Sequence, residues 1–166
     1  MRIRVIGAHL PRLDQEGIRR FIAEDVAAFG RTIRELRERG ITDLTDEEIE
    51  ERALELPGEL NADLQTCALF ELEVTGNEME FDPSAFENPE TGYCGWEPAF
   101  LTMDGRAVLF EGYRAPPDVR DFRVAFYVHE WQGPSRLFGV AGELELPPFT
   151  AVPQRLWKLA PYACVD

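Results

Sequence analysis

Residues 45–75 read TDEEIEERALELPGELNADLQTCALFELEVT, and within them the spacing of apolar side chains changes from 3.6 residues to two. The stretch begins with a capping box, in which the Thr45 hydroxyl bonds an amide three residues later and the glutamate there reaches back. This pattern predicts a helix that starts at Thr45 and ends at Pro57-Gly58, because proline and glycine interrupt helices. From Ala68 onward apolar and acidic residues alternate, which predicts a strand with one buried face.

A longer helix is predicted over residues 15–39. Asp14 can cap its first turn, and Gly40 can end it, since glycine adopts the left-handed conformation that closes many helices. The apolar residues within it are spaced by three and four, as one buried face requires. They are Ile18, Phe21, Ile22, Val26, Phe29, Ile33 and Leu36. We expect the part of this face formed by Ile18, Val26, Phe29 and Ile33 to pack on a sheet.

Strand patterns recur through the rest of the chain. Further strands are predicted at residues 2–8, 122–131, 137–140 and 143–146, and a hairpin is predicted from 98–103 and 106–111, joined by Asp104-Gly105. Two helices near the N-terminus followed by a series of strands indicate the α+β class. We therefore expect a single α+β domain over residues 1–166, with the two helices packed on a largely antiparallel sheet of five to seven strands.

Acidic residues are concentrated in one segment. Sixteen of the 31 acidic residues, but only Arg52 among the 17 basic ones, lie between residues 43 and 90. Sixteen negative charges and one positive charge give this segment a formal charge of −15, against −14 for the whole chain. Such a surface repels nucleic acids and anionic membranes, and it attracts basic partners over roughly a Debye length.

Several functional classes lack their sequence signals. No apolar run is long enough to span a membrane, and the N-terminus lacks the apolar core of a signal peptide, so we expect a cytoplasmic protein without membrane contact. The three cysteines and two histidines lack metal-ligand spacing, and no EF-hand or nucleotide-binding motif occurs. We therefore expect neither a metal nor a cofactor. No basic run is interleaved with aromatic residues, so direct nucleic-acid binding is not expected.

A candidate ligand site lies on the aromatic strand near residue 127. Tyr127, His129 and Trp131 share one face if this strand is continuous, because alternate strand residues point the same way. Cys94 and Trp96, from the preceding glycine-rich loop, can join them in a small-molecule-binding or hydrolytic site. The sequence shows no carboxylate that would orient His129 as a general base. We therefore prefer a binding function to an enzymatic one.

The acidic segment supports the preferred hypothesis. It coincides with predicted helices and strands, and its charges repel one another at a density that solubility alone does not require. We expect an inhibitor or immunity-type protein that occludes a basic surface of a partner protein, such as a nucleic-acid-binding protein or a toxin. The alternative is a solvated face that has no partner. The expected partner-binding residues, with two aromatic anchors at the end, are Glu47, Glu50, Glu51, Glu55, Glu71, Glu73, Glu78, Glu80, Tyr93 and Trp96.

Overall fold

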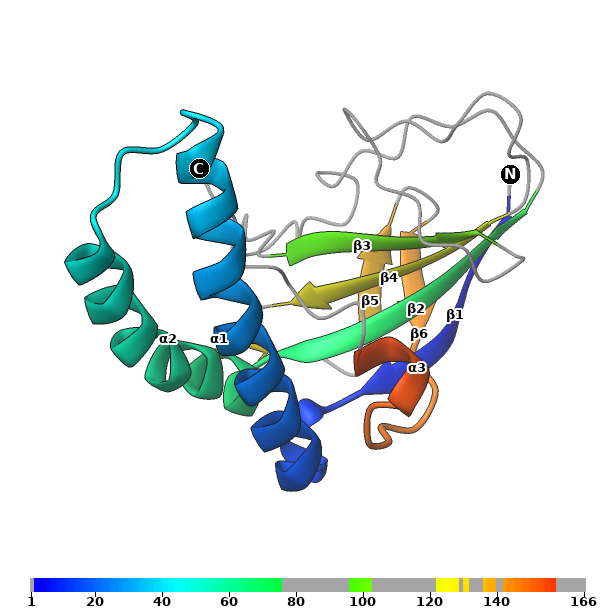
Figure 1. The fold of residues 1–166 in the computed structure, drawn as a ribbon. Helices are drawn as coiled ribbons and strands as arrows, with labels where there is room; N and C mark the ends of the chain where they lie inside the picture. Colours follow the sequence, from blue (N-terminus) through cyan, green and yellow to red (C-terminus); the bar gives the residue numbers. More distant parts are fainter. Residues whose placement is uncertain are drawn as a thin grey trace.

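In chain order, two long helices follow the first strand and precede the remaining strands. The structure is a computed structural model that describes residues 2–75, 96–102, 122–128, 130–131, 136–139 and 142–157. In chain order its elements are β1 (Arg2–His9), the 3-10 turn η1 (Pro11–Leu13), α1 (Gln15–Glu38), α2 (Asp46–Thr66), β2 (Ala68–Thr75), β3 (Trp96–Thr102), β4 (Phe122–Val128), β5 (Arg136–Gly139), β6 (Gly142–Glu145) and α3 (Gln154–Trp157). Figure 1 shows this arrangement, and it confirms the α+β class.

Helix α1 begins and ends where the sequence predicts. The Asp14 carboxylate accepts a hydrogen bond from the Gly17 amide at 2.8 Å, which satisfies one of the free amides of the first turn. At the other end Gly40 has a φ of 70°, and its amide donates to the Arg37 carbonyl at 2.9 Å. The next amide, that of Ile41, donates to the Leu36 carbonyl at 2.9 Å. This is the Schellman closure that a glycine in this position permits.

Helix α2 begins at the predicted capping box. The Thr45 hydroxyl accepts from the Glu48 amide at 3.2 Å, and the Glu48 carboxylate accepts from the Thr45 amide at 2.7 Å. The predicted end at Pro57-Gly58 is wrong, because the helix continues to Thr66.

Burial explains why the helix continues past its proline. An interior proline loses one hydrogen bond and costs about 3 kcal/mol. Leu56, Leu60 and Leu64 follow one another at four-residue intervals across this point, and all three are buried. Burying one leucine side chain stabilises the folded state by about 1.5–3 kcal/mol, so the three together outweigh the proline. Figure 1 shows that α2 bends along its length, as a helix with an interior proline is expected to do.

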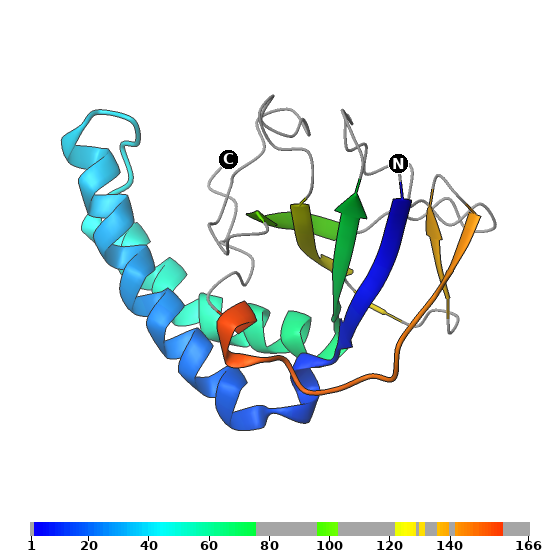
Figure 2. The same cartoon turned by 90° about the vertical axis from the view of Figure 1, so that its right-hand side faces the viewer.

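The two helices pack chiefly on each other. They run side by side in both views (Figures 1 and 2), and contact between them extends further than contact with any strand. They reach the sheet near the start of α1 and the end of α2, where Ile18 and Leu64 join a buried cluster with Leu69 of β2 and Tyr127 of β4. The expectation that Ile18, Val26, Phe29 and Ile33 of α1 pack on the sheet is therefore met only in part. Ile18 and Ile33 are buried, whereas Val26 and Phe29 are half-buried.

The main sheet is antiparallel and has the strand order β1-β2-β4-β3. Strands β5 and β6 pair with each other in a separate hairpin. The expectation of one sheet of five to seven strands is wrong for the part of the chain that the structure describes. One reason is that the outer edge of β1 is already occupied near its end. The Thr150 amide donates to the Ala8 carbonyl at 3.0 Å and its carbonyl accepts from the Leu10 amide at 2.9 Å, so this segment and not a strand occupies that end of β1 in the described chain.

Both faces of the sheet are covered. Phe70 and Leu72 of β2 lie on one face in a cluster with Leu137 of β5. Leu69 points to the opposite face, toward the helices and α3. Alternate residues of β2 therefore face two buried surfaces, and neither face of this strand is open to solvent as a whole. The acidic residues of β2 consequently lie on a covered face.

The other strand predictions have mixed outcomes. The strands predicted at 2–8, 137–140 and 143–146 are observed within one residue at either end, and the first strand of the hairpin is observed as β3. Strand β4 ends at Val128, three residues earlier than predicted. The Asp104-Gly105 turn and the strand at 106–111 lie outside the described residues.

Candidate functional site

The exposed face of α2 carries the acidic residues that the sequence singled out. Glu47, Glu50, Glu51 and Glu55 are all exposed. Glu55 lies 3.5 Å from Arg52, which also pairs with Glu59 at 2.7 Å. The other three form no ion pair with any residue that the structure describes. Within the described part of the chain, these three carboxylates therefore remain uncompensated.

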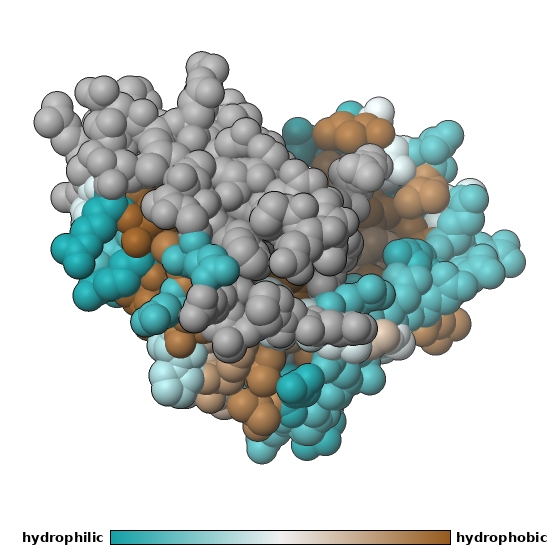
Figure 3. All heavy atoms as spheres, turned by 180° about the vertical axis from the view of Figure 1, so that it is seen from behind, coloured by the Kyte–Doolittle hydropathy of each residue, from teal (hydrophilic) through white to brown (hydrophobic). Residues whose placement is uncertain are grey.

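A leucine lies among these carboxylates. Leu54 is 83% exposed, the most exposed large apolar side chain of the described chain. Positions 47, 50, 51 and 54 follow a spacing of three, four and seven residues, which places them on one face of the helix. The opposite face carries the buried residues Ile49, Leu56, Leu60 and Leu64. In Figure 3 the helical end of the molecule, at the right, is mainly hydrophilic and is interrupted by separate hydrophobic side chains.

The two acidic residues of β2 are not on this surface. Glu71 is only 3% exposed, and Glu73 has a side chain exposed by 17% that pairs with Arg4 at 2.7 Å. Arg123 of β4 lies 3.8 Å from Glu73 on its other side. The expectation that these carboxylates face a partner is corrected by their position on a covered face of the sheet.

The remaining predicted partner-binding residues lie outside this description. Glu78, Glu80 and Tyr93 are not among the described residues. Trp96 is the first residue of β3, but its side chain is not described.

The alternative site does not assemble as predicted. Tyr127 is 1% exposed and faces the helices, where burial raises its pKa and its hydroxyl has no hydrogen-bond partner among the described residues. Trp131 packs on the other face of the sheet, with its ring centroid 4.9 Å from that of Phe70. The strand ends before Trp131, and Glu130 has a φ of 48°, so the alternation on which the prediction depended is broken. His129 and Cys94 lie outside the described residues.

A buried polar cluster lies where β1, β2 and the segment before α3 meet. We define it by the side chains of His9, Glu71, Thr150 and Arg155. His9 Nε2 lies 2.9 Å from Glu71 Oε2, and His9 Nδ1 lies 2.8 Å from Thr150 Oγ1. Glu71 Oε1 accepts no well-aligned hydrogen bond from the described residues, but Arg155 Nη1 forms an ion pair with it at 2.7 Å. His9 and Glu71 are buried, whereas Thr150 and Arg155 reach the surface.

The charges of this cluster determine which imidazole nitrogen carries a hydrogen. Burial alone would raise the pKa of Glu71, but His9 and Arg155 outweigh burial and lower that pKa to about 2. Glu71 is therefore an anion at neutral pH and can only accept hydrogen bonds. The adjacent Nε2 of His9 must then carry a hydrogen, and in the neutral imidazole the lone pair lies on Nδ1, facing Thr150 Oγ1. In this tautomer a basic nitrogen lies beside the hydroxyl of Thr150.

Gly7 makes room for this cluster. The pairing of β1 with β2 shifts between Val5 and Gly7, so that Gly7 lies opposite Glu71. A Cβ atom on Gly7 would lie 2.5 Å from Glu71 Oε2 and 2.6 Å from His9 Nε2, closer than any side-chain carbon can approach. Only glycine fits this position without displacing the polar groups.

Sequence reasoning missed this cluster because it assigned Glu71 to a solvent-exposed face. His9 and Glu71 are 62 positions apart, and Thr150 is 141 positions from His9. The signal available in the sequence was Gly7, which stands two positions before His9 in a strand whose other residues are larger. Pairing across the sheet was needed to connect these residues.

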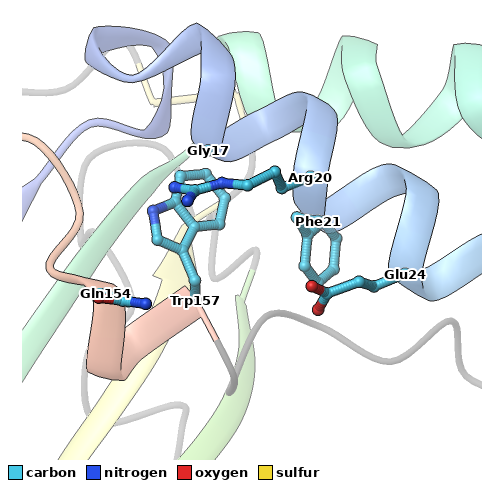
Figure 4. Close-up of a pocket in the computed structure, with 6 residues that line it drawn as sticks. All are labelled: Gly17, Arg20, Phe21, Glu24, Gln154 and Trp157. Carbon is cyan, nitrogen blue, oxygen red and sulfur yellow. The ribbon is translucent and has the colours of Figure 1, made fainter.

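A small pocket lies between α1 and α3. It has a volume of about 110 Å³ and is lined by Gly17, Arg20, Phe21, Glu24, Gln154 and Trp157. In Figure 4 the Glu24 carboxylate lies beside the ring of Phe21, and the Arg20 side chain extends toward Trp157, which comes from α3 as Gln154 does. The rings of Phe21 and Trp157 are 6.0 Å apart and tilted by 33°. Neither Tyr127 nor Trp131 lines this pocket, so it is not the predicted ligand site.

The described residues also lack two other kinds of site. They contain no group of three or more histidine, cysteine, aspartate or glutamate side chains that could hold a metal ion. None of the described helices combines the length and apolar character needed to cross a membrane. No protein-family model matches the chain, and neither does any curated protein or solved structure.

Proposed function

We propose that this chain is an acidic cytoplasmic protein that binds and occludes a basic surface of a partner protein, as inhibitors and immunity proteins do. The observation that carries this proposal is the outer face of α2, where Glu47, Glu50 and Glu51 lie uncompensated around the exposed Leu54. We refer to these four residues as the acidic face.

The acidic face reduces the stability of the free protein. Like charges spaced by three or four residues on a helix destabilise it by about 0.2–0.5 kcal/mol per pair, and Glu47 forms such pairs with both Glu50 and Glu51. Leaving a leucine exposed forgoes about 1.5–3 kcal/mol of burial energy. A partner with lysine or arginine side chains around an apolar pocket would relieve the repulsion and bury the leucine.

The surface is also well ordered for binding. The capping box holds the first turn of α2, and Asp46 pairs with Arg37 of α1 at 2.9 Å, which ties the start of one helix to the end of the other. A helix fixed in this way loses little conformational entropy on association. Its carboxylates should accelerate association with a basic partner, and that acceleration should weaken as salt increases.

This geometry leaves fewer partner-binding residues in the proposed interface than the sequence predicts. Glu55 is at the margin of the acidic face because Arg52 partly neutralises it. Glu71 and Glu73 are left out of the proposed interface, since both are paired inside the protein.

The test is affinity capture from the native host at low and high salt, followed by mass spectrometry and binding measurements with the purified partner. The variant E47K/E50K/E51K should lose a basic partner that wild type retains at low salt and releases at high salt. Leu54→Ala should weaken binding by at least roughly tenfold, corresponding to about 1.4 kcal/mol for a central anchor.

A matched control separates location from net charge. The variant E24K/E35K/E38K makes the same change in charge on exposed positions of α1 and should bind as wild type does. If both triple variants weaken binding equally, net charge and not the acidic face is responsible. The proposal is refuted if partner binding changes neither with salt nor with the charge reversals on α2.

A further inference from the structure

We propose that Thr150 is an activated hydroxyl nucleophile that accepts acyl groups from small activated esters. In this proposal His9 is the general base and Glu71 is a positioning residue. The activity is separate from partner binding, because the acidic face lies on α2 and the Thr150 hydroxyl lies beside β1.

The contacts within the buried polar cluster follow the order of a nucleophile, a base and an orienting acid. Thr150 Oγ1 is 2.8 Å from His9 Nδ1, and His9 Nε2 is 2.9 Å from Glu71 Oε2. Both distances lie within the range over which a general base removes a proton. Thr150 is an exposed residue, and its hydroxyl lies at the boundary between solvent and the buried imidazole of His9, which is 6% exposed.

The orientation of His9 is held on both sides. Glu71 accepts from Nε2, which leaves the Nδ1 lone pair directed at Thr150. The backbone of Thr150 is paired with β1 through its amide and its carbonyl, so the hydroxyl is held close to the imidazole. Triads of this kind use the acid to fix the tautomer and orientation of the histidine.

A purely structural role would not require this arrangement. Replacing both partners of a buried hydrogen bond with apolar groups of the same shape can be nearly neutral or stabilising. Here the sheet instead accommodates a buried imidazole and carboxylate, and Gly7 leaves the space that they occupy. The polar groups converge on the hydroxyl of one exposed residue, Thr150.

The reaction balances without a metal or an oxidant. Thr150 Oγ1 attacks the carbonyl carbon of the ester while its proton passes to His9 Nδ1. The bond between that carbon and the leaving oxygen breaks, and the leaving alcohol takes the proton from the imidazolium. Water then attacks the acyl-threonine, passes one proton to Nδ1, and releases a carboxylic acid as Thr150 regains its hydrogen. The net reaction is an ester and water giving an acid and an alcohol.

The experiment incubates the 166-residue chain with p-nitrophenyl acetate at neutral pH. Release of nitrophenolate gives the rate, and peptide mapping by mass spectrometry locates the acetyl group. We expect acetylation at Thr150 in wild type. Acetylation at position 150 should persist in Thr150→Ser and be lost in Thr150→Ala. Thr32→Ala, which removes an exposed threonine from α1, should react as wild type does.

Variants of the other two groups test their roles. His9→Gln should slow acetylation at Thr150 by roughly 100-fold or more, the usual contribution of a general base. Glu71→Gln should slow it and should also shift the imidazole nitrogen resonances of His9, because a neutral amide does not fix the same tautomer. Circular dichroism checks that each variant is folded. If His9→Gln or Glu71→Gln does not fold, the comparison of Thr150→Ser with Thr150→Ala decides the outcome.

Two results would overturn the proposal. One is acetylation confined to lysine, histidine or the amino terminus, with Thr150 unmodified and nitrophenolate released as fast by Thr150→Ala as by wild type. The other is a Thr150 adduct that forms at the wild-type rate in folded His9→Gln.

Discussion

Replacing Glu71 with glutamine removes one charge from the buried polar cluster while keeping the shape of the side chain. The pKa of Glu71 is lowered from 4.5 to about 2, although its burial acts in the opposite direction. Each pKa unit corresponds to about 1.4 kcal/mol of differential stabilisation of the charged form, so this shift contributes about 3 kcal/mol to folding. Glu71 is 3% exposed, so solvent screens this contribution little. We expect the variant to be less stable by about 3 kcal/mol at neutral pH.

The pH dependence follows from the sign of the shift. A carboxyl group whose pKa is lower in the folded protein stabilises it most above the unfolded pKa, here 4.5. That contribution is lost as the pH falls through the folded pKa of about 2. The difference in unfolding free energy between wild type and Glu71→Gln should therefore be constant near neutral pH, shrink below pH 4.5, and become small near pH 2.

The assay is urea unfolding followed by far-ultraviolet circular dichroism at several pH values between neutral and acid. Glu47→Gln is the control, because this carboxylate is exposed and has no described ion pair, and its effect should stay within about 0.5 kcal/mol. A loss below about 1 kcal/mol for Glu71→Gln at neutral pH would refute the reasoning. So would a loss of the expected size that does not change with pH.

Three further predictions concern other parts of the fold. Gly7→Ala should lower the stability measured by thermal unfolding by about 1–3 kcal/mol, because its Cβ would overlap the buried polar cluster. Gly58→Ala, on the open side of α2, should raise the stability by about 0.5–1 kcal/mol. Similar effects at both positions would contradict this account. Thr45→Ala should cost about 1 kcal/mol in urea unfolding, because it removes the capping box, and an unchanged midpoint would show that the cap is not needed. Burial, assisted by the charge of Asp63, raises the pKa of Cys67 to about 12, so a thiol reagent should label Cys67 only after unfolding; peptide mapping that finds rapid labelling in the folded protein would refute this.

Local signals predicted the ends of elements well wherever they act within a few residues. Asp14 and Gly40 delimit α1, and the capping box at Thr45 starts α2, because each depends on hydrogen bonds within one or two turns. The same kind of signal failed at Pro57. The proline weakens the helix locally, but the burial of leucines on both sides depends on the packing of the whole chain.

The positions of the acidic residues likewise depend partly on local sequence and partly on the packing of the whole chain. Their number and their concentration between residues 43 and 90 are properties of the sequence, and so is the amphipathic pattern that places Glu47, Glu50 and Glu51 on the outside of α2. Whether an acidic residue on a strand faces solvent depends on what covers that face. Because α3 and the edge of β1 cover it at Glu71, this carboxylate became part of an internal network.

The sequence by itself determined the α+β class, both ends of α1, the start of α2 and the negative charge, since these follow from local hydrogen bonding, periodicity and composition. Only the tertiary structure decided the strand order, the separation of Tyr127 from Trp131, and the meeting of His9, Glu71 and Thr150. The physical reason is that strand pairing joins residues with no fixed spacing along the chain. A contact across 141 positions leaves no periodic trace in the sequence.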